Sequence, residues 1–265
     1  MNNPHLTPAN LLGGRRLPPA WAAARTAFIC FTPFPNGFAR YVTETAPERF
    51  FLHSPNSEVR LCHYEGIPFL VISEVYGFPV GATTVEELVH HGVRQIIGVG
   101  YAGAFNGATM GQPFVATHTM ADLPLADHYG VPALAPCGPA GDLEARLAAV
   151  LAAHHLTWAG YTVWNGNSLY REYPHIIDFM REQGCDVVNM DTLSLYAVAP
   201  VLAREIGEPV HCLYVGTVTD SAQAEAEEWQ SDLIEAVERK EAHPHDRLVQ
   251  FMVEQFLPSL EQAGE

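Results

Sequence analysis

The chain has 265 residues, of which 48% are hydrophobic, so it can bury a large core, and we expect a single domain over residues 1–265. Its 14 Lys and Arg stand against 30 Asp and Glu, and the net charge of −16 disfavours nucleic acid and anionic membranes as partners. The five cysteines are widely spaced and lie mostly in apolar runs, which predicts reduced thiols. The first segment has no basic end leading into an apolar stretch, and together these features predict a cytoplasmic location.

In chain order, an arm rich in Pro, Asn and Gly covers residues 1–25, and apolar runs then alternate with segments of helical periodicity. The apolar runs predict strands at residues 26–31, 59–64, 68–73, 96–99, 113–120, 161–164, 186–190 and 210–218. The periodic segments predict helices at residues 38–45, 143–155, 174–183, 193–204 and 246–260, and a further helix capped by Thr83 and Thr84 that ends at Gly92. This alternation predicts an α/β fold with the site at the strand ends.

The segment 94–111 carries the densest group of glycines in the chain. Its apolar run ends in Gly98, Gly100 and Gly103, and we interpret it as a strand, a glycine turn and a hairpin-like return. The three glycines also spell G-x-G-x-x-G, but a dinucleotide site needs a helix to begin at the last glycine, and here turns and a strand follow. We therefore predict no nicotinamide, flavin or other cofactor. The alternative role of these glycines is close packing at a strand end.

Two carboxylates follow predicted strands directly. Asp191 comes after the strand at 186–190, and Asp220 comes after the strand at 210–218. A pair of carboxylates at strand exits suits acid-base chemistry or the recognition of hydroxyl groups. The alternative is that each aspartate caps the helix that follows it.

Aromatic and histidine side chains add further candidates. Trp164 lies on a strand and either offers a face to a planar ligand ring or packs in the core. His128 lies in a polar loop where packing does not require it, which favours a binding role. The pairs His90-His91, His154-His155 and His243-x-His245 lack completing ligands at a usual spacing, so we predict no metal site. No G-x-S-x-G nucleophile motif is present, which disfavours a serine hydrolase of the usual α/β type.

Six segments in order resemble motifs of the nucleoside phosphorylase superfamily, which includes purine nucleoside phosphorylases, uridine phosphorylases and nucleosidases. They are Pro4-His5-Leu6, Val75-Tyr76-Gly77-Phe78-Pro79 with Glu87-Leu88, Gly100-Tyr101-Ala102-Gly103, Trp164-Asn165-Gly166-Asn167 with Tyr170-Arg171-Glu172, Val188-Asn189-Met190-Asp191 and Thr219-Asp220-Ser221. The resemblance covers most of the chain. It implies a central mixed β-sheet flanked by helices.

The resemblance also implies roles for individual residues. Met190 and Asp191 would hold a ribose with Asn189 beside them, and Asp220 would protonate the leaving purine as the catalytic acid. Trp164 and Arg171 would lie beside the base, and Tyr101 and Gly103 would form the strand end at the substrate. His5 would reach the sugar bound by a neighbouring subunit, which predicts a homo-oligomer, either a dimer or a trimer of dimers.

The chain departs from the family where the family binds phosphate. The G-D-P-x-R loop is replaced by Thr32-Pro33-Phe34-Pro35-Asn36, the second phosphate-binding arginine falls at Gly98, and the phosphate-binding Ser or Thr falls at Tyr101. Losing two guanidinium groups removes the charge-assisted bonds that capture an oxyanion. We therefore expect cleavage of an N-glycosidic bond of a nucleoside-like small molecule that does not depend on phosphate. Two alternatives stay open, an enzyme of different chemistry in specialised metabolism that reuses the pocket, and a non-catalytic binding or storage protein.

Overall fold

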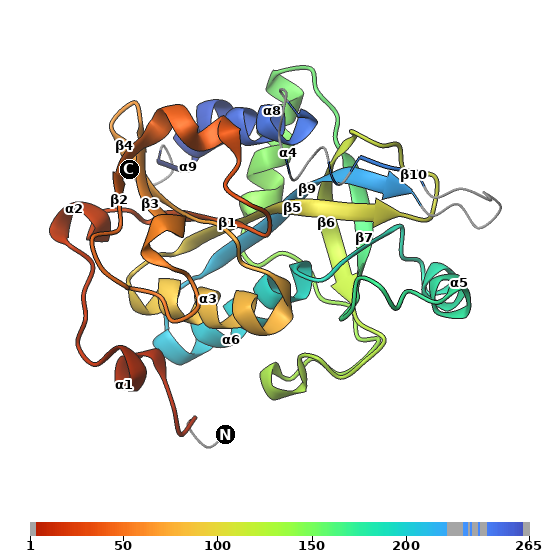
Figure 1. The fold of residues 1–265 in the computed structure, drawn as a ribbon, viewed down its shortest axis with the longest axis horizontal. Coiled ribbons are helices and arrows are strands. Elements are labelled where there is room, and N and C mark those ends of the chain that lie inside the picture. Colours follow the sequence, from red (N-terminus) through yellow and green to blue (C-terminus); the bar gives the residue numbers. More distant parts are fainter. Residues whose placement is uncertain (1–3, 222–229, 233, 235–237, 239–242, 262–265) are drawn as a thin grey trace.

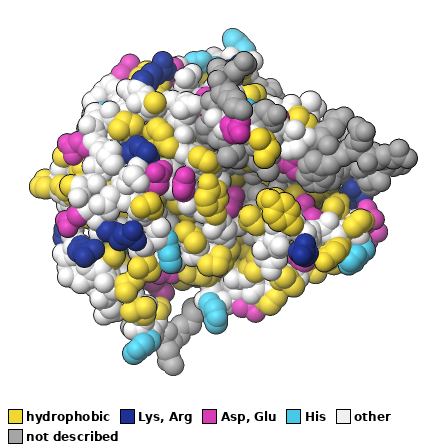
Figure 2. Space-filling model, viewed as in Figure 1, with side chains coloured by type: hydrophobic (Ala, Val, Ile, Leu, Met, Phe, Trp, Pro, Cys, Tyr) yellow, Lys and Arg dark blue, Asp and Glu magenta, His cyan; other side chains and the backbone are white. Residues whose placement is uncertain are grey.

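The protein, described by a computed structural model over residues 4–221, 230–232, 234, 238 and 243–261, is built on one mixed β-sheet with helices on both faces (Figure 1). This architecture confirms the predicted fold class. No helix among the described residues is long and apolar enough to cross a membrane. On the face drawn in Figure 2, Lys and Arg side chains are few, whereas hydrophobic side chains cover much of the centre.

Within the described residues, ten strands form the sheet in the order β10-β9-β6-β7-β8-β5-β1-β4-β3-β2. Their bounds are Thr26–Cys30 (β1), Val42–Thr45 (β2), Val59–Tyr64 (β3), Ile67–Ile72 (β4), Gln95–Ala104 (β5), Pro113–Met120 (β6), Ala159–Asn165 (β7), Val187–Asn189 (β8), His211–Ser221 (β9) and Gln230–Ser231 (β10). Strand β5 pairs with β9 as well as with β8 and β1. Five strands therefore close into a ring, from β5 through β9, β6, β7 and β8 back to β5.

The helices cover the two faces of this sheet. Their bounds are Pro8–Leu12 (α1), Pro19–Ala22 (α2), Gly77–His90 (α3), Leu143–Ala153 (α4), Pro174–Glu182 (α5), Thr192–Ile206 (α6), Pro244–Phe251 (α8) and Leu257–Glu261 (α9), with a π-helical turn at Met252–Phe256 between the last two. Helices α3 and α6 pack on one face, and α4, α8 and α9 lie on the other (Figure 1). Side chains alternate across β1, where Ala27 and Ile29 join the first core and Phe28 and Cys30 join the second, as expected for a strand buried on both sides.

Two of the predicted helices differ from the structure. Residues Asn36–Tyr41 form a 3₁₀ helix, and the chain then becomes strand β2, so the helix predicted over residues 38–45 is wrong. The β-branched residues of Val42–Thr45 find a pairing partner in β3, and this pairing overrides the local helical pattern. Helix α3 begins at Gly77, so Thr83 and Thr84 lie inside it, where their hydroxyls donate to the carbonyls four residues earlier.

The predicted glycine turn is also wrong. Strand β5 continues through Gly98, Gly100 and Gly103 to Ala104, and its neighbours are β1, β8 and β9 rather than β6. Glycine is needed at these positions because large side chains of neighbouring elements occupy the space that a Cβ atom would take. A Cβ at Gly98 would lie 2.8 Å from Tyr214 Cδ2, and one at Gly100 would lie 2.2 Å from the Tyr214 hydroxyl.

Candidate active site

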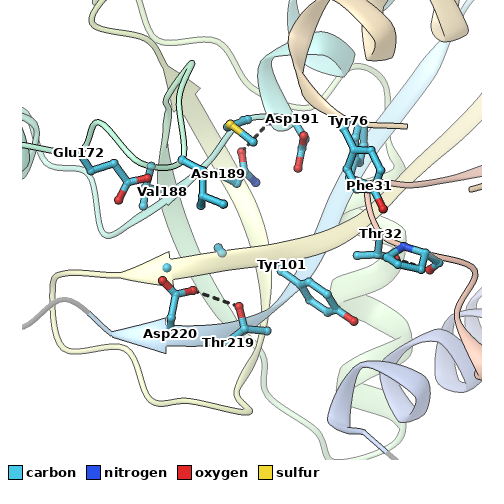
Figure 3. A pocket seen from close by; sticks show the side chains of 15 residues that line it. Phe31, Thr32, Tyr76, Tyr101, Glu172, Val188, Asn189, Asp191, Thr219 and Asp220 are labelled. Carbon is cyan, nitrogen blue, oxygen red and sulfur yellow. Dashed lines mark hydrogen bonds between the residues drawn. The ribbon is translucent and has the colours of Figure 1, made fainter. Parts of the chain in front are cut away.

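A cavity of about 220 Å³ opens where strands β5 and β9 end and where the chain leaves β1 and β8. It is lined by Phe31, Thr32, Pro33, Tyr76, Tyr101, Ala102, Gly103, Leu169, Glu172, Val188, Asn189, Met190, Asp191, Thr219 and Asp220. Figure 3 shows Glu172 and Asp220 toward one end, Phe31, Thr32 and Tyr76 toward the other, and Asn189 and Asp191 between them. We call these parts the acidic end, the aromatic end and the middle of the pocket.

The ring of strands brings together site residues that are far apart in the sequence. Of the residues predicted from the sequence, six line this pocket, namely Tyr101, Gly103, Asn189, Met190, Asp191 and Asp220. They come from β5, from the end of β8 and from β9. The closed pairing explains their proximity, because Gly103 is the sheet partner of both Val188 and Asp220.

Asp220 is only 8% exposed and faces the acidic end. Its Oδ1 accepts a hydrogen bond of 3.1 Å from the Thr219 hydroxyl. Its Oδ2 lies above Gly103, where an added Cβ would be 2.7 Å away, so the glycine makes room for the carboxylate. Burial, with a smaller contribution from the charge of Asp232, raises the pKa of Asp220 to about 6. The sequence also has an acidic run from Glu225 onward whose charge would favour the same shift, but this run lies mostly outside the described residues.

Asp191 lies in the middle of the pocket and is 7% exposed. It precedes helix α6, but its side chain makes no capping bond to that helix. Instead, Oδ1 accepts the backbone N–H of Gly77 at 3.0 Å, the first residue of α3. Burial raises the pKa of Asp191 to about 7, and the hydrogen bond from Gly77 opposes this shift. Asp191 thus combines the capping role with a position in the pocket, although the helix it caps is not the next one in sequence.

Glu172 is a pocket residue that sequence reasoning did not select. It lines the acidic end, and among the described residues no hydrogen bond or ion pair to its carboxylate is found. Burial first, and the charge of Asp220 second, raise its pKa to about 7. The sequence signal for Glu172 is the Tyr170-Arg171-Glu172 segment, in which the family resemblance assigns the position beside the base to Arg171. That arginine is exposed, and its guanidinium donates to the carbonyl of Tyr170 at 2.8 Å.

The other sequence candidates lie outside the pocket of this chain. Trp164 is 3% exposed, packs beside Phe105 and donates from its indole N–H to Asp122 at 2.8 Å. His128 lines a separate hollow between the N-terminal arm and helices α3 and α6. His5 is exposed on that arm. The binding roles assigned to these side chains and to Arg171 therefore stay predictions from the sequence.

The aromatic end is uncharged. Phe31 packs against Tyr214 with ring centroids 5.8 Å apart, and the two rings fill the space beside Gly98 and Gly100. Tyr101, which also lines the pocket, contacts the ring of His245 edge to face, with ring centroids 4.7 Å apart. Among the described residues that line the pocket there are three carboxylic acids and no Lys, Arg or His. A bound anion would therefore meet acidic groups without a compensating cation.

Within the described part of the chain, no group of three or more His, Cys, Asp or Glu is arranged to hold a metal ion. The histidines at residues 90, 91 and 154 lie at the ends of helices α3 and α4, as their sequence positions predict. The cavity instead gathers three acids whose pKa values are raised, a combination that is enriched at functional sites.

Comparison with known proteins gives a consistent result. The family model of the phosphorylase superfamily matches residues 26–254. The uncharacterized protein R802 of Acanthamoeba polyphaga mimivirus is 34% identical over 245 residues, which cover 91% of this chain and 93% of that protein.

Among solved structures, uridine phosphorylase from Vibrio fischeri, complexed with 6-hydroxy-1-naphthoic acid, matches with a TM-score of 0.64 and 18% identity over 91% of this chain and 92% of its own. The 5'-methylthioadenosine/S-adenosyl homocysteine nucleosidase of Campylobacter jejuni matches with a TM-score of 0.63 and 14% identity, over 90% of this chain and 99% of its own. A futalosine hydrolase mutant of Helicobacter pylori matches with a TM-score of 0.63 and 12% identity, again over 90% of this chain and 99% of its own. At these identities the likeness concerns the fold.

Proposed function

Because the chain belongs to the phosphorylase superfamily, we propose that it cleaves the N-glycosidic bond of a nucleoside-like small molecule and that the cleavage does not use phosphate. The observation that carries this proposal is the composition of the pocket. Three carboxylic acids with raised pKa values converge on one cavity that has an uncharged aromatic end. Such a pocket suits acid-assisted departure of a base and disfavours an anionic co-substrate.

In this proposal Asp220 is the general acid. Cleavage through a transition state with oxocarbenium character needs the leaving base to be neutralised as the bond breaks. A pKa of about 6 allows Asp220 to hold a proton in part of the molecules near neutral pH. The hydroxyl of Thr219 fixes one oxygen, and the open space above Gly103 leaves the other oxygen directed at the cavity.

The middle of the pocket supplies the contacts to the sugar. Asn189 is held by its side-chain oxygen, which accepts the backbone N–H groups of Asp191 and Thr192. Asp191 is in turn fixed by the N–H of Gly77, so the segment presents Met190 and the second carboxylate oxygen of Asp191 in a set orientation. Holding the sugar still in this way lowers the entropic cost of reaching the transition state.

The nucleophile would enter at the aromatic end. The space that an arginine at position 98 would need is already filled, because even a Cβ there would lie 2.8 Å from Tyr214 and 3.0 Å from Leu195. Phe31 and Tyr214 pack over the same strand. This supports water as the nucleophile. The aromatic lining by Phe31 and Tyr76 also favours a second candidate, transfer of the glycosyl group to a neutral, apolar acceptor.

Assembly is part of the proposal. The arm that carries His5 lies apart from the pocket of its own chain and exposes Leu6 and Leu11, which are 61% and 45% exposed. We infer that the arm contacts a second copy, as the family resemblance implies. Light scattering at micromolar concentration tests this, with a dimer or larger assembly expected and a monomer contradicting it.

The activity is tested by incubating the protein with a panel of purine and pyrimidine nucleosides in phosphate-free buffer and separating the products by chromatography. We expect release of a free base together with a free sugar. Where a glycosyl acceptor is added, a glycosylated acceptor would identify the transferase. The absence of base release from every nucleoside, with and without acceptors or phosphate, would contradict the proposed function.

A further inference from the structure

The two histidines at the start of helix α8 are buried beside the pocket. His245 is 0% exposed, and its ring contacts that of Tyr101. His243 is 9% exposed and directly precedes the helix. Among the described residues neither belongs to a group that could hold a metal ion. Buried polar side chains are almost always hydrogen-bonded, and the bonds of His243 lead toward the acidic end of the pocket.

Two hydrogen bonds determine which nitrogen of the His243 ring carries the proton. Nδ1 accepts the backbone N–H of His245 at 3.2 Å, a donor that the helix leaves free at its first turn. A nitrogen that accepts this bond carries no proton, so the proton of the neutral ring is on Nε2. Nε2 lies 3.4 Å from Asp232 Oδ2 and donates to it. His243 therefore caps α8 with one nitrogen and binds Asp232 with the other.

Asp232 directly follows the short strand β10, which pairs with β9 at Asp220. Ser231 is the antiparallel partner of Asp220, and the N–H of Asp232 donates to the Thr219 carbonyl at 2.8 Å. The Thr219 hydroxyl in turn donates to Asp220 Oδ1 (Figure 3). Within the described part of the chain, Oδ1 of Asp232 is buried and meets no donor, so His243 is the partner of this carboxylate. A continuous series of contacts thus joins the start of α8 to Asp220.

We propose that His243 is a positioning residue that holds Asp220 in place through Asp232. The inference rests on the proposed function, in which Asp220 is the general acid. Without the Nε2–H donor, the partly buried carboxylate of Asp232 is left unpaired, which costs more than the lost bond contributes. Asp232 then turns toward water and draws the edge of β10 away from Thr219. Because a catalytic group misplaced by about 1 Å loses roughly a hundredfold in rate, a partial shift predicts a loss of about tenfold.

Two substitutions separate the two bonds of the His243 ring. In His243→Asn the side-chain oxygen takes the place of Nδ1 and still caps α8, but nothing replaces Nε2. In His243→Gln the amide nitrogen reaches the place of Nε2 and donates to Asp232, whereas the cap is lost.

Steady-state kinetics on a nucleoside that the protein cleaves measure the consequence. In His243→Asn we expect kcat to fall about tenfold with KM within about twofold of the wild type, because the acid acts in the transition state. In His243→Gln we expect kcat within about twofold of the wild type and a lower melting temperature, because only the cap is lost. The control is His155→Asn, at an exposed position after α4 where a φ of 55° suits asparagine.

Hydrogen–deuterium exchange of the peptide that contains residues 216–221 adds a measurement that does not require catalysis. Exchange should become faster in His243→Asn and stay as in the wild type in His243→Gln. Normal turnover in His243→Asn, or an equal loss in both variants, overturns the role of His243 while the proposed function stands. Exchange that changes as expected in a protein that cleaves no nucleoside supports the link from His243 to Asp220 and contradicts the proposed function.

Discussion

Glu172 and Glu87 have the same raised pKa of about 7, but they lie in different surroundings. Glu87 in α3 is 1% exposed, and its two carboxylate oxygens accept the backbone N–H of Leu52 at 3.0 and 3.2 Å. These hydrogen bonds link the loop at Leu52 to helix α3, so a protein donor contacts both oxygens of the Glu87 carboxylate. Glu172 meets no such donor among the described residues and faces a cavity.

A raised pKa of a carboxylic acid therefore indicates burial but does not by itself indicate function. A functional interpretation needs a second feature, a carboxylate oxygen that no protein donor satisfies and that opens toward space for a ligand. Asp220 and Asp191 each have this feature at one oxygen, since the other oxygen accepts a hydrogen bond from Thr219 in Asp220 and from Gly77 in Asp191. The comparison can be tested by changing acids and their neighbours at the two places.

The largest effect is expected for Asp220→Asn, which keeps the size of the side chain and removes the acid. Turnover should fall roughly 100- to 10,000-fold, the range typical of lost general acid catalysis, while the affinity for the base changes little. Steady-state kinetics and calorimetry on the same preparation measure both. Asp178→Asn, at an exposed ion pair with Arg181 in α5, is the matched control and should keep normal turnover. Normal turnover in Asp220→Asn would remove Asp220 as the acid.

A smaller loss of activity is expected for Gly103→Ala. The added methyl carbon would lie 2.7 Å from Asp220 Oδ2 and must displace the carboxylate, and a misplaced catalytic group costs roughly tenfold to a hundredfold in rate. Gly166→Ala is the control, because its methyl carbon would meet nothing closer than Val188 Cγ2 at 3.5 Å. Equal turnover in the two variants would show that the position of Asp220 Oδ2 does not matter.

The smallest effect is expected for Glu87→Gln, and it should appear in stability rather than in turnover. The folded protein holds the proton on Glu87 up to about pH 7, whereas an unfolded chain releases it near pH 4.5. The wild type therefore loses stability from Glu87 as the pH rises through this window, and the Gln variant does not. Relative to the wild type, Glu87→Gln should gain about 1 kcal/mol or more in free energy of unfolding between pH 5 and pH 8. Urea unfolding at both pH values measures the gain, and a loss of turnover would contradict the structural role of Glu87.

The sequence predicted most strands and helices because their apolar patterns are local. It could not predict that β5 continues through its glycines, since that depends on Tyr214 and Phe31, which fill the space beside the strand from elsewhere in the chain. It also misplaced the start of α3, where the N–H of Gly77 is satisfied by Asp191, 114 residues away.

The candidate site was predicted only in part, because local patterns place some of its residues while others depend on how the chain turns. Asp220 and Asp191 stand at strand ends, a position that sequence alone can assign, and both line the pocket. Arg171 and Glu172 are neighbours in sequence, so their motif placed the segment near the pocket but could not decide which side chain turns inward. The structure turns Glu172 toward the cavity and leaves Arg171 exposed.

The dependence of the cleavage rate on phosphate tests the proposed function without any mutation. With a nucleoside that the protein cleaves, initial rates and products are measured from phosphate-free buffer to millimolar phosphate, with the sugar product identified by mass spectrometry. The pocket contains no Lys or Arg among its described lining residues, so we predict a rate that does not increase with phosphate and a product without a phosphate group. A rate that rises with phosphate and yields the sugar 1-phosphate would contradict phosphate-independent cleavage.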